Sequence, residues 1–378
     1  MVALGAAPAV LGSQACSAPS TEVDGGDLMG VFDHRDASAD GKAPDGGKRR
    51  GKKDAGASPA ASAEDPSGLA DASLRPAVEG VCVAEQGTPN RDTRRTLGRP
   101  ACRGAQVLEW KDSEGSPRYA CVFAPPGVET RAPLPLVVFF HDPQDDPTAV
   151  DKKTAFRKAL GSYSVNKDPA HTGFVILAVQ GRALSGGSRG NRYDVDYTGP
   201  DNVDVATTDH FVAELDQKGL VDRRRIYTLG ASAGGHMAAT YAMTRPDKVA
   251  AFATYGTDAP PATWSCPGPP PPGLVAYRAC DGVISCESVE RWLRARDQVS
   301  AETAWMRLGS ANDDEPACAT RNKCTPKRAE GNHHRWPKGK EDVFLSFFSK
   351  HTLGPGPGAG APGPAAPAGE PAVDPPAP

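Results

Sequence analysis

The chain has 378 residues, and its composition and charge exclude several classes of protein. It contains 41 Gly and 37 Pro, but they do not follow the Gly-X-Y period of collagen. Its 43 basic and 46 acidic residues give a net charge of −3, too balanced to predict nucleic-acid binding through a basic surface. No segment approaches the run of about 20 apolar residues that a transmembrane helix requires. We therefore expect neither a fibrous protein, a nucleic-acid-binding protein nor a membrane-spanning one.

The first segment, residues 1–16, resembles a secretion signal or a lipoprotein signal. Residues 2–11 are small and apolar, and small residues follow before Cys16. A cysteine at this place is typical of a bacterial lipoprotein, although Ser13 stands where an aliphatic residue is usual and no basic residues lead the segment. We expect an exported protein, secreted or attached to the cell envelope, with Cys16 as a candidate lipid tether to the membrane.

Low-complexity segments flank the part that we expect to fold. Residues 17–77 are rich in Ala, Gly, Asp, Ser and Lys, and show no helical or strand period, which predicts a disordered linker. Residues 353–378 are almost entirely Pro, Ala and Gly, which predicts a disordered tail. Residues 78–352 remain as the folded part, long enough for one large domain or two small ones.

The cysteines support export. Beyond Cys16, eight cysteines lie in the folded part, namely Cys82, Cys102, Cys121, Cys266, Cys280, Cys286, Cys318 and Cys324. An even number in an exported chain predicts up to four disulfides, whose pairing the sequence leaves open. Sequence neighbours such as Cys280 with Cys286 and Cys318 with Cys324 are plausible pairs. The alternative of a zinc site is disfavoured because no paired C-x-x-C is present.

Strand and helix patterns alternate along this domain. A hairpin is expected first, followed by short apolar runs typical of buried strands, with helical candidates between them. The alternation predicts an α/β fold with a mostly parallel sheet flanked by helices, and sites at the carboxyl ends of its strands. The expected strands cover residues 105–110, 118–124, 134–140, 174–179, 225–229, 249–255 and 274–277, and the expected helices cover 152–160, 205–217, 236–243, 288–296 and 342–350.

A candidate nucleophile follows the strand expected at 225–229. The sequence Gly230-Ala-Ser-Ala-Gly-Gly235 is a G-x-S-x-G pattern between a strand and a helix. Such a turn raises the Ser232 hydroxyl above the sheet, and the start of the next helix offers an amide, that of Ala233, to a developing oxyanion. The alternative is a Gly-rich turn without chemistry.

A nucleophilic serine needs a base and an orienting carboxylate, expected in the order Ser, acid, His. Asp281 follows the strand at 274–277 and is the candidate acid, with Asp258, Glu287 and Asp297 as rivals. The alternative is that Asp281 caps a turn before Gly282.

Two adjacent histidines, His333 and His334, lie in an expected loop before the last helix and are candidate bases. A polar surface loop with two solvated histidines is the alternative. His141 and His236 lie too early in the chain for the expected order.

From about residue 118 to 351 the chain resembles secreted α/β-hydrolase esterases of the polyhydroxybutyrate depolymerase and feruloyl or acetylxylan esterase type. The segment Val221-Asp-Arg that leads to the serine turn is similar to that family's lead-in, and Tyr277-Arg-Ala-Cys-Asp281 aligns with its acid loop. His334-Arg-Trp-Pro337 matches its His-x-Trp-Pro signature. The resemblance implies an α/β-hydrolase fold, Asp281 as the acid, and His334 rather than His333 as the base.

The chain departs from this family at its oxyanion loop. The family's oxyanion strand ends in His-Gly, whereas this chain reads His141-Asp-Pro143, and Pro143 has no amide hydrogen to donate. The second oxyanion donor, beside Ala233, is therefore expected to be Asp142 or a shifted backbone. The acid loop also lacks the family's His-Gly pair, because Tyr277 and Arg278 stand there.

The resulting expectation is an exported serine esterase that cleaves small or polymeric carboxylic esters, of the polyester or plant-wall type, without a metal or organic cofactor. Trp264 and Trp336 can line the substrate pocket or pack against loops. A peptidase or lactonase on the same fold is the alternative, as is a binding module with impaired catalysis.

Overall fold

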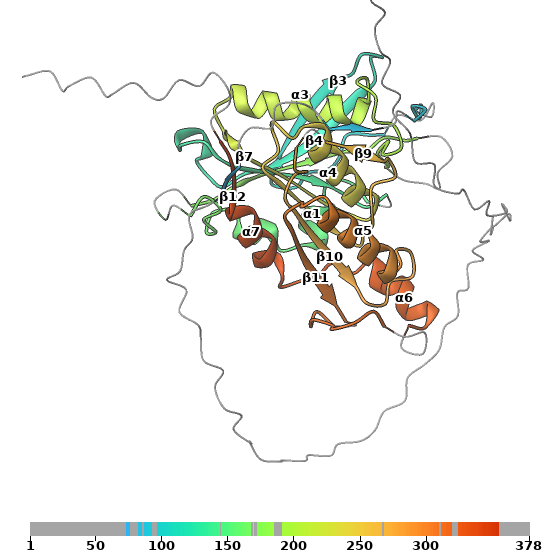
Figure 1. Cartoon of the computed structure of the whole chain (residues 1–378). Coiled ribbons are helices and arrows are strands. Elements are labelled where there is room, and N and C mark those ends of the chain that lie inside the picture. The colour runs from blue at the N-terminus through green and yellow to red at the C-terminus, as the bar shows by residue number, and fades with distance from the viewer. Residues whose placement is uncertain are drawn as a thin grey trace, which may run out of the picture. The chain divides into compact units, whose positions relative to one another are not determined.

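An eight-stranded sheet forms the centre of the structure, a computed structural model of the chain (Figure 1). The structure describes residues 73–354, except 76–81, 85–86, 93–96, 144, 168, 170–171, 185–190, 267, 310 and 320–323. All of these lie in the unit Asp65–Pro378, and the other unit, Met1–Glu64, lies outside the described residues. The expectations for the signal-like segment, for Cys16, for most of the linker and for most of the C-terminal tail therefore also lie outside them, although Leu353 belongs to a strand.

The strand order identifies the fold. Across the sheet the order is β3-β4-β6-β5-β7-β8-β10-β11, and β4 alone runs antiparallel to its neighbours. This crossover order with an antiparallel second strand is that of the α/β-hydrolase fold, so the predicted fold class is confirmed. The strands are β3 (Gln106–Lys111), β4 (Pro117–Phe123), β5 (Leu134–Phe140), β6 (Val175–Val179), β7 (Val221–Ala231), β8 (Ala251–Tyr255), β10 (Gly273–Arg278) and β11 (Thr303–Leu308).

Helices cover both faces of the sheet. Alternate side chains of β5 enter different cores: Leu136, Val138 and Phe140 pack with α3, α4 and α5, whereas Val137 and Phe139 pack with α1, α2 and α7. Because both faces are covered, every residue of β5 is buried, which explains its continuous apolar sequence. The helices are α1 (Ala149–Lys153), α2 (Phe156–Ala159), α3 (Val203–Gln217), α4 (Ala233–Thr244), α5 (Cys286–Gln298), α6 (Pro326–His333) and α7 (Glu341–Ser349), with a 3₁₀ turn, η1 (Val128–Thr130).

Three elements differ from the sequence expectation. The helix expected at 152–160 is two short helices, because Thr154 between them is extended. Edge strand β11 was not expected, and its exposed Trp305 and otherwise mixed burial explain why it lacks a continuous apolar run. Helix α6 lies where a loop was expected around the paired histidines. The sequence did not predict this helix because its residues are polar, include Gly331 and form no apolar stripe.

Two pairs of short strands lie outside the main sheet. β1 (Ser73–Arg75) runs parallel to β12 (His351–Leu353), which joins the two ends of the described region. β1 falls in the range 17–77 that was expected to be a linker, so regular structure begins before residue 78. β2 (Val83–Ala84) pairs antiparallel with β9 (Trp264–Ser265).

Four disulfides join the eight cysteines of the folded part, which confirms the expected number. The expected pairing of sequence neighbours is wrong. Cys280 follows β10 and bonds to Cys324 before α6, whereas Cys286 begins α5 and bonds to Cys318. The bonds are Cys82–Cys266, Cys102–Cys121, Cys280–Cys324 and Cys286–Cys318.

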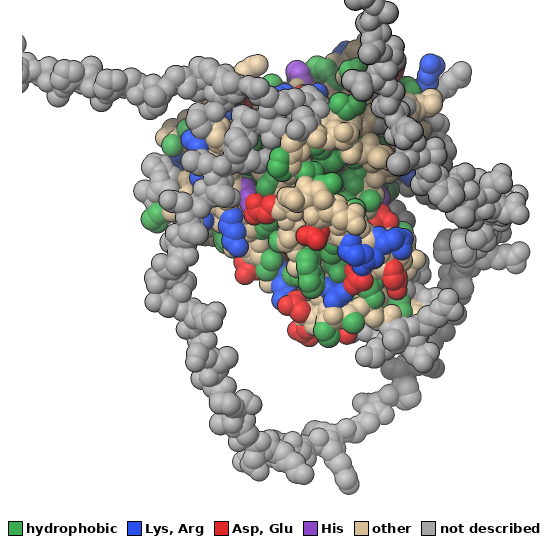
Figure 2. Space-filling view, in the orientation of Figure 1, with side chains coloured by type: hydrophobic (Ala, Val, Ile, Leu, Met, Phe, Trp, Pro, Cys, Tyr) green, Lys and Arg blue, Asp and Glu red, His purple; other side chains and the backbone are tan. Residues whose placement is uncertain are grey.

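The visible face of the domain mixes basic and acidic side chains, in keeping with the balanced net charge (Figure 2). Within the described ranges, no helix is both long and apolar enough to span a bilayer.

Candidate active site

Ser232 lies at the sharp turn between β7 and α4, at the carboxyl edge of the sheet. Its backbone has φ 54° and ψ −129°, a left-handed conformation that is costly for a residue with a side chain. The turn is held by the Ser232 amide, which donates to the Tyr255 carbonyl at 2.9 Å, and by the Thr257 hydroxyl, which donates to the Ser232 carbonyl at 2.9 Å. Neighbouring strand β8 therefore fixes the strained turn.

The glycines of the pattern are required by close backbone approach. A Cβ at Gly230 would lie 2.0 Å from the Gly234 carbonyl oxygen, and a Cβ at Gly234 would lie 2.3 Å from that of Phe140. Both distances are far below van der Waals contact. The turn therefore packs directly against the end of β5 and tolerates no side chain at either position.

Asp281 lies in the loop after β10, as expected. Its Oδ1 accepts hydrogen bonds from the amides of Val283 at 2.8 Å and Ile284 at 2.9 Å. Its side chain is only 2% exposed. The two amides fix the carboxylate in one orientation. Asp281 therefore does cap the turn, as the alternative expected, and its carboxylate also remains able to accept from a histidine.

His333 connects the serine to the aspartate. His333 Nε2 lies 2.9 Å from Ser232 Oγ, and His333 Nδ1 lies 3.0 Å from both carboxylate oxygens of Asp281. Since the carboxylate can only accept, Nδ1 carries the proton and Nε2 accepts from the Ser232 hydroxyl. The structure thus contains a continuous Ser–His–Asp hydrogen-bond chain.

The choice of His334 is corrected by this geometry. His333 is the last residue of α6 and 3% exposed, whereas His334 follows the helix and its side chain is 37% exposed. Consecutive residues at a helix end point in different directions, so only one can face Ser232. His334 Nδ1 instead lies 3.1 Å from Asp142 Oδ2.

The segment after β5 lies beside the serine turn, as the oxyanion expectation requires. The Ala233 amide has no hydrogen-bond partner among the described residues, so it is available to an oxyanion. The His141 amide donates to the Tyr193 hydroxyl at 3.2 Å and is not available. Asp142 is 6% exposed, and its carboxylate contacts His334. The role expected for Asp142 as second donor stays a prediction.

His141 is buried beneath this segment. Its Nδ1 donates to the Asp142 carbonyl at 2.8 Å, and its Nε2 accepts from the Gly181 amide at 3.1 Å. Burial lowers the pKa of His141, although nearby carboxylates oppose the effect. The neutral imidazole therefore acts as a fixed spacer between β5 and the loop after β6.

A buried guanidinium supports the histidine end of the site. Arg278 Nε donates to the Tyr255 hydroxyl at 2.8 Å, and its Nη2 donates to the Arg335 carbonyl at 3.1 Å. The Tyr255 hydroxyl donates in turn to the Asn332 carbonyl at 3.0 Å. Arg278 thus ties β10 to the end of α6. Sequence reasoning gave it no role.

A disulfide and a side-chain amide connect the acid and base segments. The Cys280–Cys324 bond joins the residue before Asp281 to the segment that leads into α6. Asn332 Nδ2 donates to the Cys280 carbonyl at 2.7 Å. These two contacts fix the distance between the Asp281 loop and the end of α6, which carries His333.

The remaining candidates lie elsewhere. The rival acid Asp258 contacts His236 Nε2 at 3.0 Å, and this hydrogen bond lowers the pKa of the Asp258 carboxyl. Trp336 is buried and donates to Glu341 Oε1 at 3.1 Å, so it packs in the core next to the paired histidines. Trp264 lines a separate cavity that does not include Ser232.

Among the described residues, two groups of side chains are close enough to hold a cation. Asp142, His333 and His334 form one, but both nitrogens of His333 are already engaged by Ser232 and Asp281. In the other, Cys286 and Cys318 are joined as a disulfide and offer no thiolate beside Glu290. Neither donor set is typical of a metal centre.

Comparison with known proteins finds no matching family profile and no significantly similar curated protein. A solved thermostable esterase aligns with a TM-score of 0.45 and 16% identity over 66% of this chain, and the match covers 64% of that chain, less than two thirds of it. Native Est2, an esterase of the planctomycete Thermogutta terrifontis, aligns with a TM-score of 0.42 and 17% identity over 57% of this chain and 85% of its own. Its apo form gives a TM-score of 0.43 and 17% identity over 65% and 93%. These low values carry no inference about activity.

Proposed function

We propose that the chain is a serine hydrolase that cleaves carboxylic esters through an acyl-enzyme. The observation that carries the proposal is the hydrogen-bond chain Ser232–His333–Asp281, set on a strained turn between a strand and a helix. Hydrogen bonding to an imidazole held by a carboxylate is the arrangement that activates a serine hydroxyl.

Acylation begins when Ser232 Oγ forms a bond to the ester carbonyl carbon and its proton passes to His333 Nε2. Asp281 stabilises the imidazolium that results, because its negative carboxylate accepts a hydrogen bond from the Nδ1–H group. The negative charge moves to the carbonyl oxygen, where the Ala233 amide at the start of α4 stabilises it. Collapse of this intermediate breaks the ester C–O bond, and His333 returns the proton to the leaving alcohol.

Deacylation repeats these steps with water. His333 Nε2 takes a proton from the attacking water, whose oxygen bonds to the acyl carbon. Collapse expels Ser232 Oγ, which recovers its proton from His333, and the carboxylic acid leaves. The residues return to their starting protonation states, so the cycle needs no co-reactant besides water.

Polymeric or plant-wall esters, together with export, are the finer part of this proposal. Four disulfides are typical of a chain that matures in an oxidising compartment, which supports export. An exported esterase meets extracellular polymers, and the partly exposed Ser232 lies at the sheet edge where an extended chain can approach.

Hydrolysis of short p-nitrophenyl esters by the purified chain tests the proposal. We expect release of p-nitrophenol from the acetate and butyrate, and its loss in Ser232→Ala. The same protein is offered peptide p-nitroanilides and aryl lactones, whose preferential cleavage would favour a peptidase or a lactonase. No turnover of any substrate by a folded wild-type chain would favour a binding module.

A further inference from the structure

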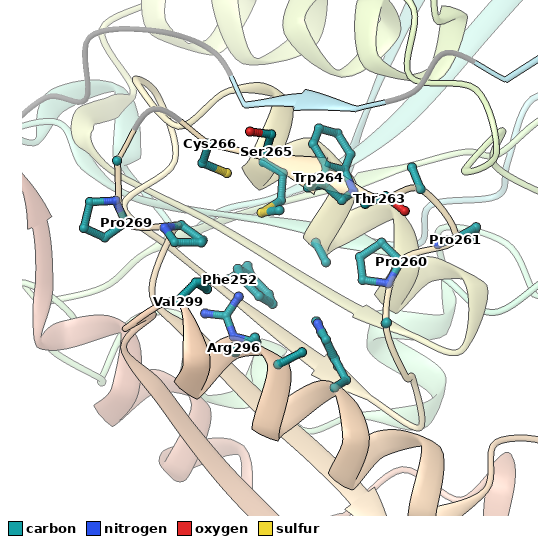
Figure 3. A pocket seen from close by; sticks show the side chains of 18 residues that line it. Phe252, Pro260, Pro261, Thr263, Trp264, Ser265, Cys266, Pro269, Arg296 and Val299 are labelled. Carbon is teal, nitrogen blue, oxygen red and sulfur yellow. The ribbon is translucent and has the colours of Figure 1, made fainter. Parts of the chain in front are cut away.

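A large cavity lies between α4, α5 and the segment after β8, away from the proposed catalytic residues. Its volume is about 810 Å³, within the range of small-molecule sites. Met243 of α4 and Val299 at the end of α5 lie in its wall, together with Trp264 (Figure 3). Ala239, the lining residue of α4 that comes first after Ser232, follows it by about two helical turns, or roughly 10 Å along α4. The cavity is therefore a separate site.

The described lining of this cavity contains a single charged side chain, that of Arg296, and no carboxylate. Most other lining residues are apolar: alanines, prolines, Phe252, Trp292 and Val299. Pro269 and Pro270, in the segment before β10, belong to this apolar wall. A pocket with apolar walls and one fixed charge selects ligands by that charge.

Arg296 is 5% exposed and lacks a counter-ion among the described residues. Its Nε donates to the Thr303 hydroxyl at 2.8 Å, and its Nη2 donates to the carbonyls of Pro271 at 2.8 Å and Glu302 at 3.2 Å. All of these partners are neutral. Within the described part of the chain, Nη1 has no hydrogen-bond partner, so two donor hydrogens are left for a ligand.

The surroundings favour an anion beside this guanidinium. Burial without a carboxylate lowers the pKa of Arg296 to about 10, which reflects the cost of an uncompensated buried charge. Aromatic faces offset part of this cost, since the guanidinium carbon lies 4.9 Å from the Phe252 ring centroid and 6.0 Å from that of Trp292. A carboxylate in the cavity would supply the missing counter-charge.

Trp264 lines the same cavity, and its Nε1 is a buried donor with no hydrogen-bond partner in the described structure. The described lining therefore offers the donor hydrogens of Arg296 Nη1 and no acidic acceptor. This balance suits a ligand whose polar end only accepts hydrogen bonds.

We propose that this cavity binds an apolar monocarboxylate, such as a medium-chain fatty acid, whose carboxylate pairs with Arg296 Nη1 and whose hydrocarbon part lies against Phe252, Trp292 and Val299. This site is independent of the proposed hydrolysis, because none of its lining residues belongs to the Ser232 hydrogen-bond chain.

Titration calorimetry with octanoate, and with 1-octanol as the uncharged probe of equal chain length, tests the proposal on the full chain. We expect octanoate to bind one site with a Kd at least tenfold below that of octanol. Equal affinities for the two probes, or no octanoate binding, would overturn it.

Two variants at Val299 test whether the ligand carboxylate lies near Arg296, without a change in the buried core. Val299 is 55% exposed and lies one turn after Arg296 on α5. Val299→Glu should weaken octanoate binding by about threefold or more, because it places a negative charge near the ligand carboxylate. The control Val299→Lys, which carries the opposite charge, should not weaken it. Equal effects of the two variants would contradict a carboxylate beside Arg296. Arg296→Gln should abolish the preference for octanoate over octanol, with thermal unfolding measured alongside.

Photo-crosslinking separates this cavity from the proposed catalytic site. A diazirine analogue of octanoic acid should label peptides that contain Trp264 or Val299, to the same extent in wild type and Ser232→Ala. Labelling confined to peptides with Ser232 or His333 would show that octanoate binds as a product acid at the catalytic residues, and would refute the cavity site whatever the outcome of the ester assay.

Discussion

His333 Nε2 lies 2.9 Å from Ser232 Oγ, although 101 residues separate the two in the chain. The contact depends on α6, which ends at His333, and on β7, which ends next to Ser232. The neighbouring His334 points instead to Asp142. The proposed base, His333, and the histidine that contacts Asp142, His334, are therefore neighbours in the sequence but face different partners.

Replacement of each histidine by alanine tests this assignment. His333→Ala removes the proposed base, so kcat for a p-nitrophenyl ester should fall by about 10⁴-fold. His334→Ala leaves the base in place and removes only the contact between His334 and the Asp142 carboxylate, so kcat should fall by less than about tenfold. Steady-state kinetics decide between the two, and a larger loss in His334→Ala than in His333→Ala would reverse the assignment.

The Cys280–Cys324 disulfide should support both stability and catalysis. Its loop spans a sequence separation of 44 residues, and removing such a crosslink costs about 4 kcal/mol in the chain-entropy estimate. The double variant Cys280→Ala/Cys324→Ala should also lower kcat, because the bond joins the Asp281 loop to the segment before α6. Urea unfolding and ester hydrolysis measure the two effects.

The matched control is Cys102→Ala/Cys121→Ala, which removes a bond with a sequence separation of 19 at the antiparallel edge of the sheet. That variant should lose about 3 kcal/mol of stability and retain its kcat. Equal loss of kcat in both double variants would argue against a specific link between Cys280–Cys324 and the site.

The stability of the chain should depend on pH through His141. Burial lowers the pKa of the folded imidazole below the usual 6.5, so the unfolded chain binds this proton first as the pH falls. The free energy of unfolding should therefore decrease below about pH 6.5, until the folded imidazole is protonated as well. In His141→Gln, whose amide oxygen can still accept from Gly181, that decrease should be smaller. Urea unfolding of both proteins between pH 7.5 and 5 measures it, and identical pH profiles would exclude His141 as the source.

The sequence predicted the strand–turn–helix that contains Ser232 and the loop that contains Asp281, because each residue comes shortly after a buried strand whose apolar run is easy to recognise. It did not distinguish His333 from His334, since the choice depends on where α6 ends and α6 has no apolar stripe to reveal it. The disulfide partners were equally inaccessible, because Cys280 and Cys324 meet only once β10 and α6 are packed. The role of Arg278 depends on three carbonyls from two distant segments, which no local pattern marks.

Covalent labelling by a fluorophosphonate, mapped by peptide mass spectrometry, tests the central claim most directly. A fluorophosphonate reacts with a serine only where a base activates the hydroxyl. We expect a single adduct on Ser232, formed at a similar rate in wild type and in His334→Ala. Labelling should be much slower in His333→Ala and absent in Ser232→Ala. An adduct on another residue, no adduct in the folded wild type, or equally fast labelling of His333→Ala would contradict it.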